Sequence, residues 1–168
     1  DFCVNKMKYL PENVIVLGRS IGTGPAIRLA AAKKIRLLAL VSPYLSIKKV
    51  GLSKTFVAHF IKNIFNSERY LAKISCPVFI LHGKKDELIP FAHGQAINEL
   101  LKGKVHTTLV APQHMTHNHF DIEKDLISPL VKFEEELQGL VGRDTLYSAP
   151  PPDIAVLLPY FKSEADAF

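Results

Sequence analysis

Cysteine is scarce in this chain of 168 residues, and long apolar runs are absent. The chain has only two cysteines, Cys3 and Cys76, which are far apart in the sequence, and a reducing compartment explains them without a disulfide. No apolar run approaches the ~20 residues that a membrane-spanning helix needs. With 48% hydrophobic residues, the sequence predicts one domain with a substantial core.

The chain also lacks a basic stripe interleaved with aromatic residues, although its formal net charge is +5. Its lysines are scattered in pairs, which is typical of a solvated surface: Lys33-Lys34, Lys48-Lys49, Lys84-Lys85 and Lys102/Lys104. This pattern argues against a nucleic-acid partner. Attraction to an anionic membrane surface remains as a minor alternative.

The most informative segment is a β-branched apolar run, residues 14–17, that leads directly into the motif G-x-S-x-G. This motif places a serine on a tight turn between a strand and a helix, where a histidine can take its proton. The absence of a Cβ at Gly18 and Gly22 is expected to let the flanking backbones approach closely. Ser20 is therefore a candidate nucleophile.

The residues after this motif predict a helix over 23–34, because they are rich in alanine and carry Pro25 early enough for a first turn. Ser20 thus precedes a helix N-terminus, which favours negative charge. There the N–H of Ile21 can point at a developing oxyanion.

A candidate acid and a candidate base follow in the chain order serine, acid, histidine. Asp86 lies in a polar loop just past the strand predicted at 78–82, and the carboxyl ends of strands are where sites form in open α/β sheets. Glu87 is an alternative candidate for the acid. Asp86 could instead be a solvated loop residue or the cap of the next helix. The loop after the strand predicted at 106–110 contains three histidines, His114, His117 and His119. One of them is the expected general base.

Three stretches together resemble the α/β-hydrolase superfamily, specifically the domain-containing-17 branch of serine depalmitoylases and their Bem46-like relatives. They are residues 18–26, residues 81–94 and the pair His117-Asn118, within a resemblance that runs from about Val14 to Leu137. The resemblance implies Ser20 as nucleophile, Asp86 as orienting acid and His117 as base. His117 is favoured because it alone is followed by an asparagine, like the histidine of the family.

The histidine loop departs from the family pattern, so two alternatives for the base stay open. A small residue usually precedes the family histidine, whereas this chain has Thr116, and the loop is longer by His114-Met115. His114 and His119 therefore remain candidates. The spacing H-x-x-H-x-H also allows a shared zinc ion, but no acid or cysteine except Asp121 lies nearby, and we expect no metal and no cofactor. His59, His82, His93 and His106 are interpreted as surface or packed histidines.

The alternation of strands and helices predicts a three-layer α/β fold with a mostly parallel sheet. Strands are expected at 14–17, 37–41, 78–82 and 106–110, and helices at 23–34, 54–65, 92–102 and 122–138. The family resemblance implies further strands, and a loop with a second oxyanion donor, before the serine. We therefore expect the C-terminal half of a hydrolase, with N-terminal strands missing, an unprotected edge at 14–17 and little activity by itself.

The predicted domain organisation is a catalytic part over 1–138 and an extended tail over 139–168. The tail contains three consecutive prolines, Pro150 to Pro152, which cannot continue a helix, and an apolar patch, 154–161, of undetermined role. Apolar residues at helical spacing form a stripe in the predicted helix 54–65: Phe56, Phe60, Ile61, Ile64 and Phe65. This stripe is interpreted as part of the core, and contact with an acyl chain of the substrate is the alternative.

These features predict a serine hydrolase that cleaves an ester or thioester through Ser20, His117 and Asp86, with protein depalmitoylation as one candidate reaction. A serine peptidase of the prolyl-oligopeptidase type shares the motif and the residue order. A non-catalytic binding protein on the same fold is the other alternative, since a fold does not guarantee turnover. The expected location is the cytoplasm, with peripheral membrane association through preceding residues and a lipidated protein as a candidate substrate.

Overall fold

A computed structural model describes residues 2–45 and 67–141 of the chain. The chain divides into two compact units, Asp1–Glu136 and Leu137–Phe168, and the description below concerns the first of them. The helix predicted at 54–65, its apolar stripe and the prolines and apolar patch of the tail lie outside the described residues. The proposed domain boundary after residue 138 remains a prediction.

Four parallel strands form the sheet in the order β1-β2-β3-β4. They span Ile15–Arg19 (β1), Leu37–Val41 (β2), Val78–Leu81 (β3) and Thr107–Val110 (β4). The register aligns Gly18 with Leu40, Leu40 with Ile80, and Ile80 with Leu109. The parallel α/β sheet predicted from the sequence is therefore confirmed.

The burial of each strand follows from its place in the sheet. Every residue of β2 and β3 is buried, as expected for central parallel strands that are covered on both faces. The residues of β4 and most of β1 are only partly buried, because these strands lie at the two edges of the described sheet. An edge strand leaves one row of backbone hydrogen-bonding groups unpaired.

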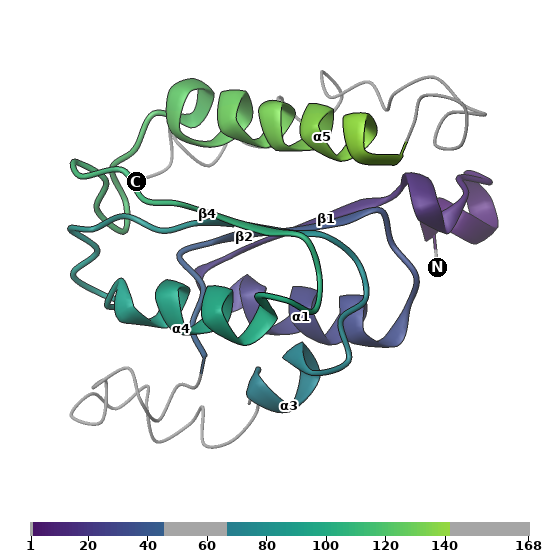
Figure 1. The fold of residues 1–168 in the computed structure, drawn as a ribbon, viewed down its shortest axis with the longest axis horizontal. Coiled ribbons are helices and arrows are strands. Elements are labelled where there is room, and N and C mark those ends of the chain that lie inside the picture. Colours follow the sequence, from purple (N-terminus) through teal and green to yellow (C-terminus); the bar gives the residue numbers. More distant parts are fainter. Residues whose placement is uncertain (1, 46–66, 142–168) are drawn as a thin grey trace. The chain divides into compact units, whose positions relative to one another are not determined.

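Among the described residues, helices cover both faces of the sheet (Figure 1). The first layer consists of α1 (Thr23–Ala32), α3 (Glu68–Leu71) and α4 (Ala92–Leu101), and α5 (Ser128–Val141) forms the second. Short helical turns occupy Phe2–Lys6, Pro11–Asn13, Ser20–Gly22 and Ile122–Ile127. The result is the three-layer arrangement that the sequence predicts.

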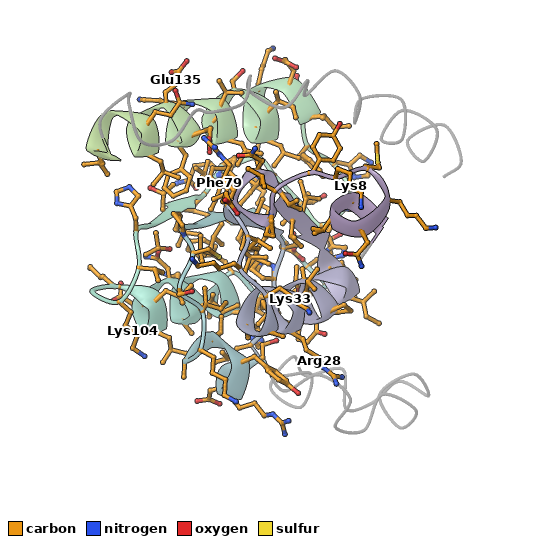
Figure 2. All side chains as sticks on the ribbon, turned by 90° about the vertical axis from the view of Figure 1, so that its right-hand side faces the viewer. Lys8, Arg28, Lys33, Phe79, Lys104 and Glu135 are labelled. Atoms are coloured by element: carbon orange, nitrogen blue, oxygen red, sulfur yellow. The ribbon has the colours of Figure 1, made fainter. Side chains whose placement is uncertain are left out.

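Alternation along the central strands divides the core between the two faces. Leu40 and Ile80 pack with Ile27 of α1 and Ile97 of α4 in the main cluster. Phe79 lies on the opposite face, where its ring is 5.9 Å from the ring of Phe133 on α5. Figure 2 shows Phe79 in the interior beneath this helix, while the labelled charged side chains lie at the periphery.

A buried ion pair fixes the second helical layer to the sheet. Arg36, which directly precedes β2, pairs with Glu134 of α5, and both side chains are largely buried. On the same face, the ring of His106 stacks on Phe133. His106 is exposed, so it is a surface histidine whose ring rests on Phe133, which agrees with the prediction of a surface or packed histidine.

The element boundaries differ from the predictions at several ends. β1 runs to Arg19, two residues further than predicted, because its pairing with β2 continues through Arg19 and Val41. α1 ends at Ala32, before the lysine pair, and the terminal helical segment opens with a π-helical turn, Ile122–Ile127. The one-turn helix α3 was not predicted, because four residues carry too little periodicity.

None of the helices within the described ranges is long and apolar enough to cross a bilayer.

Candidate functional site

Ser20 lies at the end of β1, on a backbone that few residues adopt. Its φ is +51°, a left-handed conformation that costs free energy for a residue with a Cβ. The turn is held by the Thr23 hydroxyl, which donates a 2.7 Å hydrogen bond to the Ser20 carbonyl oxygen. The buried Tyr44 also contacts this turn, because its hydroxyl donates a 3.5 Å hydrogen bond to the Ile21 carbonyl oxygen. Such a strained turn between strand and helix is the geometry that lifts a serine hydroxyl out of the sheet.

The two glycines of the motif have different roles. A Cβ on Gly18 would come within 2.7 Å of both the Ala26 Cβ and the Gly22 carbonyl oxygen. A Cβ on Gly22 would meet no described atom within 4 Å, and the φ of Gly22 is an ordinary −66°. Close approach therefore requires glycine at position 18, whereas the sequence-based expectation for Gly22 is wrong within the described residues.

His117 hydrogen-bonds to both of the other predicted site residues. Its Nε2 is 3.0 Å from the Ser20 Oγ, and its Nδ1 is 2.9 Å from Oδ2 of Asp86. The loops that follow β3 and β4 lie at the same end of the sheet, which brings Asp86 and His117 together (Figure 1). The His117 ring is almost fully buried, so water competes little for these bonds.

Asp86 is held as an ionised acceptor by the loop around it. Its Oδ1 accepts backbone hydrogen bonds from Leu88 at 3.0 Å and from Ile89 at 2.8 Å. Burial alone would raise the pKa of this carboxyl, but the hydrogen bonds from His117 and Ile89 outweigh burial and lower the pKa to about 2. The Ser42 hydroxyl also contributes to this lowering, although it makes no hydrogen bond of normal geometry within the described residues.

The ionised carboxylate decides the tautomer of His117. Because an ionised Asp86 can only accept, Nδ1 carries the proton and donates a hydrogen bond to the carboxylate. Nε2 is then an acceptor, and its partner is the Ser20 hydroxyl. This arrangement can take a proton from Ser20 during nucleophilic attack.

The two alternative histidines bond elsewhere. His114 Nε2 lies 2.9 Å from Oδ2 of Asp125, and its side chain is largely exposed. His119 Nδ1 lies 3.4 Å from the Thr116 hydroxyl. Among the described residues, no group of three histidine, cysteine, aspartate or glutamate side chains is placed to hold a metal ion. The shared-zinc alternative therefore has no support in this part of the chain.

Glu87, the alternative acid, contacts the main chain of His117 instead of its ring. Its carboxylate accepts from the His117 N–H at 3.4 Å. Asp86 is thus the carboxylate bonded to the imidazole. Ile21 is exposed and lies in the 3-10 turn before α1, but the role of its N–H as an oxyanion donor remains a prediction.

Sequence analysis missed two residues that hold this site. His82, interpreted as a surface or packed histidine, is fully buried with Nε2 2.8 Å from the Ile89 carbonyl oxygen, so it holds the loop that carries Asp86. Burial lowers its pKa, which keeps the ring neutral. Arg19, the residue directly before Ser20, donates a hydrogen bond to the carbonyl oxygen of His117. Only its position inside the motif could have drawn attention to Arg19.

Comparison with known proteins identifies the family of this chain. The human alpha/beta hydrolase domain-containing protein 17B is 34% identical over 131 residues, which are 77% of this chain. Alpha/beta hydrolase domain-containing protein 17C of Xenopus tropicalis is 32% identical over 123 residues, which are 73% of this chain. The chain belongs to the α/β-hydrolase superfamily. No protein-family model matches it.

Solved structures show the fold of this α/β-hydrolase independently of sequence. An esterase from Pyrococcus furiosus superposes with a TM-score of 0.62 at 20% identity, over 80% of this chain and 57% of the esterase. Acetyl xylan esterase 1 from Thermoanaerobacterium sp. JW/SL YS485 gives 0.63 at 16% identity, over 81% and 49% of the two chains. The chain spans less than half of its human relative, 44% of that protein's length.

Proposed function

We propose that this α/β-hydrolase is a serine hydrolase that cleaves a carboxylic ester or thioester. The observation that carries the proposal is the continuous chain of hydrogen bonds from the Ser20 Oγ through His117 to Asp86. Each of its two links has a heavy-atom distance of about 3 Å, which is within reach for proton transfer. The family relationship supports a hydrolytic reaction.

In the proposed mechanism, the Ser20 Oγ attacks the acyl carbonyl carbon while its proton passes to Nε2 of His117. The ionised Asp86 orients the ring and stabilises the imidazolium that forms. The tetrahedral oxyanion is held by the N–H of Ile21 at the start of the helix. The imidazolium then protonates the leaving alcohol or thiol, and the acyl group remains on Ser20.

Water completes the proposed cycle by the same route in reverse. His117 takes a proton from the water as it attacks the acyl-enzyme carbonyl. The second tetrahedral intermediate collapses, the Ser20 oxygen recovers its proton from His117, and the carboxylic acid leaves. No step requires a metal ion or an organic cofactor.

The finer proposal is that the acyl group is a long chain attached as a thioester to a protein. Support comes from the relationship to the domain-containing-17 proteins and from two exposed apolar side chains next to site residues. Ile21 directly follows Ser20 and Leu88 is two residues after Asp86, and they are 56% and 43% exposed. A membrane-associated cytoplasmic location, with lipidated proteins as partners, is part of the same proposal.

A fluorophosphonate probe tests the nucleophile, because the probe needs an activated serine. The full-length protein is expected to be labelled, and Ser20→Ala is expected to abolish labelling. Persistent labelling of this variant would show that another serine reacts. Hydrolysis of short and long acyl esters, an acyl thioester and a proline-containing amide then separates the candidate substrate classes.

A further inference from the structure

Arg19 connects the nucleophile to the loop of the base through one side chain. Its Nη2 donates to the His117 carbonyl oxygen at 2.9 Å and to the Asn118 Oδ1 at 3.1 Å. Its guanidinium also lies over the ring of Phe120, 5.9 Å from the centroid. Each terminal nitrogen of the guanidinium carries two hydrogens, so Nη2 can donate to both acceptors at once. The residue immediately before Ser20 thus contacts three residues of the histidine loop: His117, Asn118 and Phe120.

The main chain of His117 is held from the opposite direction by Glu87. The Glu87 carboxylate accepts from the His117 N–H, although at the longer distance of 3.4 Å. The residue before the nucleophile therefore binds the His117 carbonyl oxygen, and the residue after the acid binds its N–H. Both contacts involve a charged side chain, and the Arg19 contact, at 2.9 Å, has the length of a charge-assisted hydrogen bond.

The histidine loop needs such an attachment because it contains no regular secondary structure between β4 and Asp121. The distance between His117 Nε2 and the Ser20 Oγ must stay near 3.0 Å for proton transfer. The Arg19 contacts fix the backbone of His117 to the same turn that fixes Ser20. They act on the position of the base without touching its ring nitrogens.

We propose that Arg19 is a positioning residue, which sets the distance between Ser20 and His117 by binding the His117 carbonyl oxygen and the Asn118 side chain. This inference rests on the proposed function, because it assigns Arg19 a part in the proton transfer from Ser20. Arg19 does not need to contact the substrate for this role. Loss of the contacts therefore lowers kcat and leaves KM nearly unchanged.

The test compares Arg19→Ala and Arg19→Lys with the wild-type full-length protein in ester hydrolysis. Misplacement of a reacting group by about 1 Å can cost about 10²-fold, so kcat is expected to fall roughly 10- to 100-fold in Arg19→Ala. Lysine keeps the charge but lacks the planar group that covers Phe120. Arg19→Lys is therefore expected to recover part of the loss.

Arg69→Ala is the matched control. Arg69 also makes a hydrogen bond and a ring contact, but both are to its neighbour Tyr70 on α3. Its removal is expected to change kcat less than twofold. In the same proteins, amide hydrogen exchange is expected to rise at residues 116–119 in Arg19→Ala only, with the rest of the sheet unchanged.

A double-mutant cycle adds a reading that a general loss of stability would not give. Asn118→Ala removes one of the two acceptors of Arg19, so its effect on kcat is expected to be smaller than that of Arg19→Ala. The two substitutions together are expected to cost little more than Arg19→Ala alone, because they remove a shared contact.

The possible results separate the two proposals. A wild-type protein that hydrolyses no ester and reacts with no fluorophosphonate overturns the proposed function, and this inference with it. An active wild type with an equally active Arg19→Ala overturns the role of Arg19 alone. So does an increase in exchange throughout the sheet, because Arg19 would then act on stability and not on the histidine loop.

Discussion

Gly83 lies directly against the main chain of Met115, and a Cβ at position 83 would come within 2.2 Å of the Met115 carbonyl oxygen. The same carbonyl oxygen accepts a hydrogen bond from the Lys85 N–H at 3.1 Å. The loop that carries Asp86 and the loop that carries His117 are therefore in backbone contact. The distance between the proposed acid and base depends on this contact as well as on their own side chains.

Gly83→Ala is expected to lower both the stability and the activity of the full-length protein. The added methyl group meets a backbone atom, which cannot rotate away, so the two loops must separate. Gly22→Ala is the matched control, because its Cβ meets no described atom within 4 Å. Thermal unfolding and ester hydrolysis of both variants check this prediction, and equal behaviour of the two would contradict it.

Gly18→Ala is expected to disturb the serine turn itself. Its Cβ would overlap the Ala26 side chain and the Gly22 carbonyl oxygen, which forces α1 away from β1. We expect a loss of roughly 1–3 kcal/mol, as for other overpacked sites, and slower fluorophosphonate labelling of Ser20. Urea denaturation and the labelling rate measure the two effects. A fully stable, fully reactive Gly18→Ala would show that the close packing is not required.

Replacement of each histidine in turn separates the base from its neighbours. His117→Ala is expected to lower kcat by about 10³-fold or more, because members of a triad act as a unit. His114→Ala and His119→Ala are expected to cost roughly tenfold or less, since these residues bond to Asp125 and Thr116. Kinetics on one ester substrate decide the matter. A large loss at position 114 with little at 117 would reassign the base.

The low pKa of Asp86 predicts a contribution to stability that depends on pH. This pKa is about 2 in the folded protein, below its ordinary value of 3.8. Asp86 therefore stabilises the fold at pH values above its unfolded pKa, and the stabilisation is lost as the pH falls from about 4 through about 2. The shift corresponds to about 2 kcal/mol.

Urea denaturation of the wild type and Asp86→Asn at pH 5 and near pH 2 measures this contribution. The wild type is expected to lose about 2 kcal/mol more than the variant over this interval, because only the wild type has the ionised group. The comparison uses the change with pH and not the stability of either protein at one pH. An identical pH dependence would assign the acid sensitivity to other carboxyl groups.

Local sequence patterns determined the serine turn and the order of the site residues. The apolar run before Gly18 and the alanine-rich segment after it predicted the strand and the helix on either side of Ser20, and both are present. Asp86 was placed correctly after a fully buried strand. These features are readable because strands and helices impose short periods on the sequence.

Tertiary structure decided which histidine meets Ser20 and what holds it there. The family resemblance favoured His117 but left His114 and His119 as candidates, because the choice depends on where a loop without periodic structure places each ring. The bonds of His117 to Ser20 and Asp86 span 97 and 31 positions of the chain. The contact of Arg19 with the His117 carbonyl oxygen spans 98 positions, and only the packing of parallel strands side by side brings such distant residues to one edge of the sheet.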